Sequence, residues 1–351
     1  MNAIVNETRS PARVAPHATH KMKWLLKREF WEHKGGFFWA PIVAGAIFLF
    51  FTLLGGGTGQ MMFSRHGGKI INYNGQEMPL SEVDWNQLIA HASPEDLRQF
   101  GEAINLVTVM SAFWPMVVFS FVVFFYLLGS LYDERKDRSV LFWKSLPVSD
   151  SQTVLSKVLT AMVVAPLIAT VLSIAAMLAF GVIVSVFIAI NGGNPLTLYW
   201  GQLRPLDLLF MSFGGWPIYI LWALPTVGWL MLCSAWAKSK PFLWAVLLPI
   251  LAGVVVSWFG LFGGRGPGDG WFWQHIVARL LTGTFPGSHL LGYAGTDHLQ
   301  RLDDSAQALY GADSVVYGFH LFSTPQLWIG ALVGIAMIIL AIRLRRWRDD
   351  A

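Results

Sequence analysis

Six long runs without a charged residue constrain the fold of this chain more than any other feature. Each run lacks Asp, Glu, Lys, Arg and His, and at about 17 to 25 residues or more it can cross a bilayer core as a helix. The chain is also 54% hydrophobic and only 13% charged, which lies outside the range of soluble domains. The sequence therefore predicts an all-α polytopic membrane protein. Its six spans are expected at 37–54, 104–131, 158–190, 213–236, 242–262 and 325–342.

The third run is longer than one crossing needs but too short for two crossings with a turn. We interpret 158–190 as one helix that is kinked at Pro166 and projects past the membrane. Residues 1–20 have no apolar core, so we expect a disordered tail and no signal peptide. The predicted parts are this tail, an interfacial helix at 21–36, a membrane domain at 37–343 with external segments 55–103 and 263–324, and a second tail at 344–351.

The distribution of basic residues predicts the orientation of the spans. Eighteen of the 25 Lys and Arg residues would face the cytosol if both termini lie there. Such an excess near span ends is the pattern of the positive-inside rule. We expect a multi-pass protein of the bacterial cytoplasmic (inner) membrane with both termini cytosolic. The basic clusters border span ends, where they meet the headgroups of the lipid bilayer, so the sequence predicts no nucleic-acid partner.

The segment before the first span combines basic and aromatic side chains. An apolar helical face, interrupted by Glu29, lies opposite a face where tryptophans alternate with Lys and Arg. This composition favours a helix lying along the cytosolic membrane surface, and the alternative is a plain basic anchor. The residues assigned to the interfacial helix are Trp24, Leu25, Leu26, Lys27, Arg28, Phe30 and Trp31.

The loop between spans two and three carries a charged stretch, 133–138, followed by an apolar segment. In that segment Val140 and Trp143 share one helical face, and Phe142 and Leu146 share another. So short a helix is apolar nearly all round, and such a surface should be covered by a partner. We therefore interpret this loop as a docking element.

The same loop contains signals for a helix end and for a new helix start. Pro147 disfavours helical geometry at Leu146, and Ser149 with Gln152 fits a capping box. The sequence predicts a helix, a stop and a second helix that runs into span three. The predicted docking residues are Glu134, Arg135, Arg138, Leu141, Phe142, Trp143, Lys144, Leu146 and Pro147.

Two external segments contain recognisable local signals. In 55–103, Asn74-Gly75 predicts a hairpin turn, and Ser93-Pro94 predicts a helix start that continues into span two. In 263–324, a Gly/Pro-rich stretch precedes an aromatic helix. That helix is either an outer gate or an interfacial anchor, and the sequence leaves both open. The candidate gate residues are Trp271, Phe272, Trp273, Ile276 and Leu280.

No catalytic or metal-binding residue is predicted. The nearest approach to a site is Asp297-His298 beside Asp303-Asp304, which lacks metal-ligand spacing. The only cysteine, Cys233, lies inside a span, which excludes an intramolecular disulfide. A membrane-bound enzyme using external His and Asp residues remains an alternative function, as does a non-transport scaffold.

The spans contain no Asp, Glu, Lys, Arg or His, whereas ion-coupled transporters place such groups at the membrane midplane. Energy for transport would then have to come from a motor subunit, and the docking loop is the natural receiver. An uncharged, aromatic-rich interior favours lipids, hydrophobic peptides or amphipathic drugs as cargo over small ions. The chain has no Walker A motif, so it is not expected to hydrolyse ATP alone.

The chain resembles the permease of an ABC-2 type exporter over essentially 21–348. Residues 131–138, followed by Leu141-Phe142-Trp143-Lys144-Ser145-Leu146-Pro147, are similar to the family's "E-R-x-x-G/R-S-x-x-x-x-x-S-L-P" stretch. The segment 23–30 resembles the family's entry helix.

The resemblance implies a division of labour between this chain and other subunits. A coupling helix within 134–146 would seat in a groove of a separate ATP-binding subunit, which binds ATP and Mg. The segment 263–281 would match the family's external re-entrant helices. The implied complex has an ABC ATPase dimer and two permeases, the second being another copy or a paralogue, and it moves cargo outward.

Overall fold

The computed structural model describes residues 18–65, 70–73, 76–79, 92–261, 269–289 and 312–347. These residues are almost all helical, apart from one two-stranded hairpin. Within the described residues, six helices are long and apolar enough to cross a membrane, and each overlaps one expected span. The chain is therefore a predominantly α-helical, multi-pass membrane protein. The six helical stretches are Gly35–Thr58, Pro94–Lys136, Asp150–Ile190, Pro205–Trp236, Pro241–Gly260 and Pro325–Trp347.

The helices and strands follow one another in a simple order along the chain. Their bounds are α1 Ala18–Glu32, η1 Gly35–Trp39, α2 Ala40–Arg65, β1 Ile70–Tyr73, β2 Gln76–Pro79, α4 Pro94–Ser111, α5 Phe113–Ser130, α6 Tyr132–Lys136, α7 Ser139–Ser145, α8 Asp150–Leu159, η3 Thr160–Val164, α9 Ala165–Ile190, η4 Leu196–Trp200, α10 Pro205–Gly214, α11 Trp216–Trp236, α12 Pro241–Leu261, α13 Asp269–Phe272, η5 Trp273–Ala278, α14 Arg279–Thr282, α18 Ala312–Phe319, η6 His320–Ser323 and α19 Pro325–Trp347.

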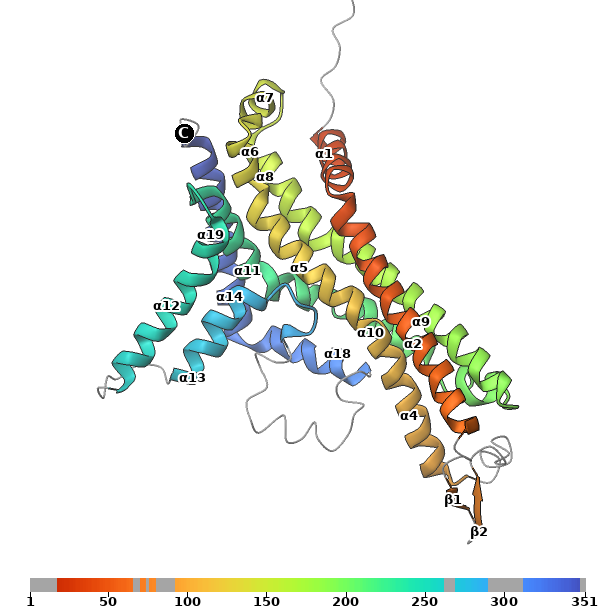
Figure 1. Cartoon of the computed structure of the whole chain (residues 1–351). Helices are drawn as coiled ribbons and strands as arrows, with labels where there is room; N and C mark the ends of the chain where they lie inside the picture. Colours follow the sequence, from red (N-terminus) through yellow and green to blue (C-terminus); the bar gives the residue numbers. More distant parts are fainter. Residues whose placement is uncertain are drawn as a thin grey trace, which may run out of the picture.

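The helix α11 forms the centre of the bundle. Within its span, 72% of the most apolar window is buried, against 17–39% for the other five spans. The helices α2, α5 and α9 pack against one another on one side of it (Figure 1). Because the outer helices expose Phe, Leu, Val and Trp side chains along their length, the outer surface matches a lipid environment.

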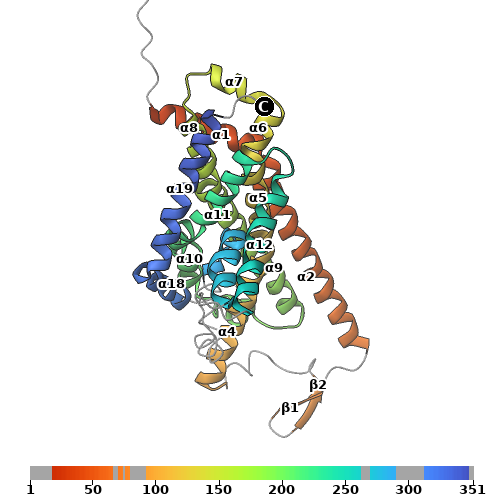
Figure 2. The same cartoon turned by 90° about the vertical axis from the view of Figure 1, so that its left-hand side faces the viewer.

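Several short helices meet at one end of the molecule, where the first described helix begins and the last described helix ends. The helices α1, α6, α7 and α8 and the end of α19 lie together there, whereas β1 and β2 lie at the opposite end (Figure 1). Figure 2 shows α1 lying across the ends of the span helices, and Figure 1 looks along its axis. We call this region the α6–α8 end.

The irregularity expected at Pro166 takes the form of a widened turn. The π-helical turn η3 comes directly before this proline, inside the continuous helix from Asp150 to Ile190. Proline lacks an N–H, and its ring crowds the carbonyl four residues earlier, which a π turn accommodates. One long helix therefore runs through the third span, as the sequence predicts.

Local start and stop signals also act as predicted. Ser93 caps α4 through a capping box with Asp96, and α4 continues into the second span. The strands β1 and β2 pair in antiparallel fashion with Tyr73 opposite Gln76. This register confirms the predicted hairpin, although its turn residues Asn74 and Gly75 lie outside the described residues.

Two glycines allow α11 and α19 to approach closely. A Cβ built on Gly228 would overlap the backbone of Gly334, and a Cβ on Gly334 would overlap the backbone around Leu224. Small residues are the usual means by which membrane helices bring their backbones together. The contact fixes α19 against the central helix and thereby positions its far end, which carries Arg345.

We expect Gly228→Ala to lower the stability of the bundle by about 1–3 kcal/mol, because the added methyl group overpacks a backbone contact. Thermal unfolding of the purified protein in detergent measures the effect. Gly57→Ala is the matched control, since a Cβ at Gly57 meets no neighbour within 4 Å. Equal melting temperatures for the two variants would contradict the close-packing account.

Candidate functional site

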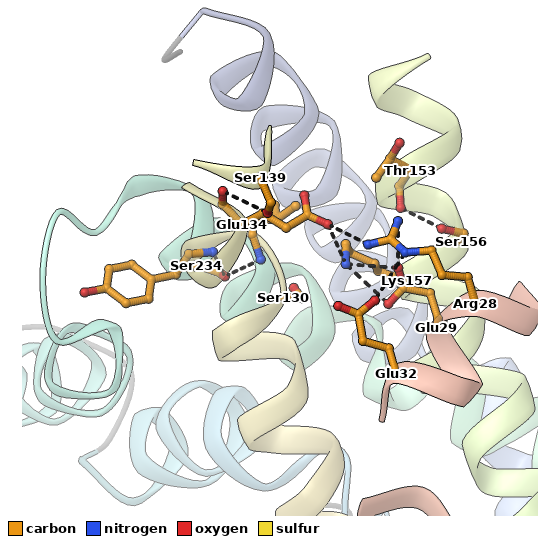
Figure 3. Close-up of polar contacts among 12 residues, drawn as sticks. Arg28, Glu29, Glu32, Ser130, Glu134, Ser139, Thr153, Ser156, Lys157 and Ser234 are labelled. Atoms are coloured by element: carbon orange, nitrogen blue, oxygen red, sulfur yellow. Dashed lines mark hydrogen bonds and ion pairs between the residues drawn. The ribbon is translucent and has the colours of Figure 1, made fainter. Parts of the chain in front are cut away.

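A cluster of charged side chains is buried at the α6–α8 end, directly beneath α7. Figure 3 shows Arg28 and Glu29 of α1, Glu134 of α6 and Lys157 of α8 meeting there. Arg345 of α19 joins the same cluster, so four elements that lie far apart in the sequence are linked. Three acidic and three basic residues make up the set, of which Arg28 and Asp150 are only partly buried, and the half-exposed Glu32 pairs with Arg28 at its edge. We call this set the buried charge cluster, and it consists of Arg28, Glu29, Glu134, Asp150, Lys157 and Arg345.

Glu29 and Lys157 form the innermost pair of the cluster. Glu29 is 0% exposed and Lys157 only 2%. The Lys157 ammonium lies 3.1 Å and 3.3 Å from the two Glu29 carboxylate oxygens. Tyr126 of α5 donates its hydroxyl to Glu29 at 2.9 Å. A buried carboxylate is tolerated only when it is paired and hydrogen-bonded, and this arrangement supplies both.

Glu134 links the α6–α7 segment to the spans. Lys157 Nζ lies 3.0 Å from its Oε1, and Arg345 donates to its Oε2. Arg345 also donates from Nε to Asp150 at 3.1 Å, so the end of α19 contacts both sides of the loop that contains α7. The cluster thus ties the C-terminal helix to the start of the third span.

The helix α7 has one packed face and one exposed face. Val140 is buried, and the Arg28 guanidinium lies 3.3 Å from the centroid of the Trp143 ring in a cation–π contact. On the other side, Leu141 is 61% exposed and Phe142 59% exposed. These two residues and the exposed Leu146 leave an apolar surface at the tip of the loop.

The remaining predicted docking residues lie in different settings. Arg135 donates to the Ser234 and Ala237 carbonyls and so holds the loop between α11 and α12. Arg138 is exposed and has φ +55, a left-handed conformation that favours glycine. Pro147 accepts a hydrogen bond from Lys21 through its carbonyl, and Lys144 is half-buried. Glu134 and Arg135 are therefore engaged within the chain, whereas the apolar docking residues around Phe142 are exposed.

The predicted helix before the first span is present as α1. Leu25 and Glu29 point into the molecule, while Trp24 and Trp31 are more than half exposed. The exposed tryptophans carry lysines over their rings, with Lys27 over Trp24 and Lys34 over Trp31, both at 5.1 Å. Of the other residues assigned to this helix, Lys27 is exposed, and Leu26, Arg28 and Phe30 are half-buried.

The predicted outer-gate residues lie on the short helical stretch α13–η5–α14. Trp273 donates to Ser257 of α12 at 3.0 Å, and Trp271 stacks on His275. Ile276 is exposed, whereas its neighbour Val277 is buried. Phe272 and Leu280 are half-buried.

The same stretch buries a charge that sequence reasoning did not single out. Arg279 is buried against the Trp222 ring and donates to the Gln326 carbonyl at 2.8 Å. Burial lowers the pKa of this guanidinium to about 10, so it stays charged at neutral pH. It connects the α13–α14 stretch to α11 and α19 by polar contacts.

Among the described residues, no group of three His, Cys, Asp or Glu side chains is placed to hold a metal ion. The external residues Asp297, His298, Asp303 and Asp304 lie outside the described part of the chain. In comparisons with known proteins, no family model, no curated protein and no solved structure matches this chain.

The buried charge cluster was not predicted, because its partners are separated by long stretches of sequence. Glu29 and Lys157 are 128 positions apart, and Glu134 and Arg345 are 211 apart. One local signal was present: Glu29 interrupts the apolar face of α1. A charge in such a position requires a buried partner, and Lys157 at the beginning of the third span supplies it.

We expect Lys157→Met to destabilise the protein by about 3–5 kcal/mol, because it leaves Glu29 buried without its cation. The double variant Glu29→Gln with Lys157→Met should recover part of this loss, since glutamine is neutral and still accepts from Tyr126. The free energy of unfolding in mixed detergent is measured for the single variants and the double variant. If the stability lost in the double variant equalled the sum of the losses in the two single variants, the Glu29–Lys157 pairing would be contradicted.

Proposed function

We propose that this chain is the membrane-spanning permease subunit of an ABC-type exporter. In this proposal a separate ATP-binding subunit hydrolyses ATP, and the permease moves a hydrophobic or amphipathic molecule outward. The protein would lie in the bacterial cytoplasmic membrane with both termini, and therefore the α6–α8 end, in the cytosol. This orientation agrees with the excess of basic residues near that end.

The exposed apolar face of α7 is the observation that carries the proposal. A seven-residue helix that presents Leu141 and Phe142 to solvent is an unfavourable surface unless a partner covers it. It stands at the tip of a loop beside the membrane-spanning helices, where a peripheral subunit can reach it (Figure 1). Exposed aromatic and aliphatic anchors of this kind dominate protein interfaces.

The contacts beneath α7 support a coupling role for the same helix. Arg28 links Trp143 of α7 to Glu134 of α6, and Glu134 in turn contacts Lys157 and Arg345. If a docked ATP-binding subunit displaced α7, these contacts would therefore transmit the movement to α1, to the third span and to α19. Packed and ion-paired elements shift between discrete arrangements and do not deform smoothly, which suits a two-state coupling device.

Other elements fit the same architecture. The helix α1 has the exposed tryptophans and lysines of an interfacial helix, and it lies across the span ends (Figure 2). The α13–η5–α14 stretch packs back against α11 and α12 from the opposite end, as a re-entrant helix would. The proposed assembly pairs this chain with a second permease, another copy or a paralogue, and with an ATPase dimer that binds ATP and Mg.

We expect Phe142→Glu to abolish docking of the ATP-binding subunit without unfolding the permease. Phe142 is exposed, so the fold loses little, but an interface that buried the new carboxylate would be strongly weakened. Mild-detergent purification from native membranes, followed by identification of bound proteins, measures the effect. The associated ATPase activity should fall at least about tenfold, which corresponds to 1.4 kcal/mol or more of binding free energy.

Leu196→Glu is the matched control, because Leu196 is also highly exposed but belongs to η4, between α9 and α10 and outside the six spans. This variant should retain the ATP-binding subunit. Equal recovery of that subunit with wild type and Phe142→Glu would contradict docking through α7. Recovery of no ATP-binding protein with wild type would contradict the exporter proposal and favour the scaffold or the external-site enzyme.

A further inference from the structure

A pocket of about 630 Å³ opens beside the buried charge cluster, between η1, α5 and α6. Its volume is in the range of sites for small organic molecules. Two glycines of η1 line it, and one of them, Gly36, lies so close to α5 that a Cβ there would reach Val122 at 2.8 Å. The pocket has two chemically different parts, an apolar wall and an acidic mouth.

The apolar wall comes mainly from the second span. Phe121, Val122 and Phe125 of α5 line the pocket together with Phe37 of η1. Phe121 and Phe125 are half exposed, so their rings are accessible from the pocket and from the outer surface of the helix. Aromatic and aliphatic side chains of this kind bind the apolar body of a ligand.

The acidic mouth comes from α6 and from the end of α1. Of its four carboxylates, Glu32 pairs with Arg28, and Glu134 pairs with Lys157 and Arg345. Asp133 and Asp137 also line the pocket, and no ion pair of theirs is found within the described residues. The Asp133 carboxylate lies over Gly129, where a Cβ would displace it.

Asp133 and Asp137 repel each other, because they are one helical turn apart. Lys136, His33 and Lys157 offset this repulsion only partly. Lys157 and His33 also line the pocket, but Lys157 is paired with Glu29 and Glu134, and none of the three forms an ion pair with Asp133 or Asp137 among the described residues. Glu134, which lines the same mouth, is already paired with Lys157 and Arg345. A cation in the mouth would relieve the repulsion, whereas an anion would add to it.

We propose that this pocket binds an amphipathic molecule with a cationic head. The head lies between Asp133 and Asp137, and the apolar body lies along Phe121, Val122 and Phe125. A bare metal ion fits less well, because it would leave the aromatic wall without a role. The inference goes beyond the proposed function, since binding to the pocket can be measured whether or not an ATP-binding subunit docks.

Binding of tetraphenylphosphonium to the full chain in lipid nanodiscs tests the proposal, after subtraction of binding to empty nanodiscs. Its negatively charged analogue tetraphenylborate has nearly the same shape and is the matched ligand. We expect saturable binding of the cation and no saturable binding of the anion. Saturable binding of both ions with similar affinity would overturn the cationic preference.

Two variants test the two parts of the pocket, the acidic mouth and the apolar wall. The double variant Asp133→Asn with Asp137→Asn should raise the Kd for the cation at least tenfold, because it removes the charge and keeps the size of the mouth. Val118→Trp should abolish binding by filling the pocket from its apolar end, since Val118 lines it. Asp207→Asn, a change in α10, is the control and should leave the Kd unchanged. Each variant is compared only after its melting temperature matches the wild type.

Unchanged affinity in the double Asn variant would overturn the assignment of the head to the mouth. Unchanged affinity in Val118→Trp would overturn the assignment of the body to the apolar wall. Because the measurement uses no ATP and no partner, a failure here is distinguishable from a failure of the exporter proposal. The Phe142→Glu variant should bind the cation as wild type does, since Phe142 does not line the pocket.

Discussion

The pairing of buried charges at the α6–α8 end is the interaction on which the arrangement of this molecule depends. Glu29 and Lys157 are withdrawn from solvent, and each charge is tolerable only because the other is present. Since Glu134, Arg345 and Arg28 extend this pairing, four elements from distant parts of the sequence meet at one place. Displacement of any of these elements would leave a charge unpaired in a poorly solvated site.

The same constraint explains how an exposed helix can be held rigidly. The helix α7 has only seven residues and is too short to be stable on its own. It is braced from below by the Arg28 contact with Trp143 and by the burial of Val140. Its apolar outer face is therefore presented in a fixed orientation, which lowers the entropy cost of binding a partner.

Local sequence signals predicted the helices well and the charge cluster poorly. The uncharged runs and the capping pairs at Ser93 and Ser149 identified the spans and the helix starts, because these features act within a few residues. Long-range pairs such as Glu134 with Arg345 leave no local pattern.

Among the candidate site residues, the sequence identified the exposed apolar side chains of α7 but did not separate them from the charged residues beside them. Glu134 and Arg135 lie in a charged stretch and were predicted to dock a partner, yet both make contacts within the chain. Glu29 interrupts an apolar face, and only the structure showed that this interruption is an anchor point. A charge on an otherwise buried face is the sequence signal that deserves a search for its partner.

Site-specific cross-linking from α7 in native membranes tests the central claim most directly. Cys233 is the only cysteine in the chain and is buried, so Cys233→Ser gives a background in which Leu141→Cys carries a single cross-linker. The account predicts a covalent adduct between position 141 and an ATP-binding protein. An adduct with lipid alone, or with no protein at all, would contradict it.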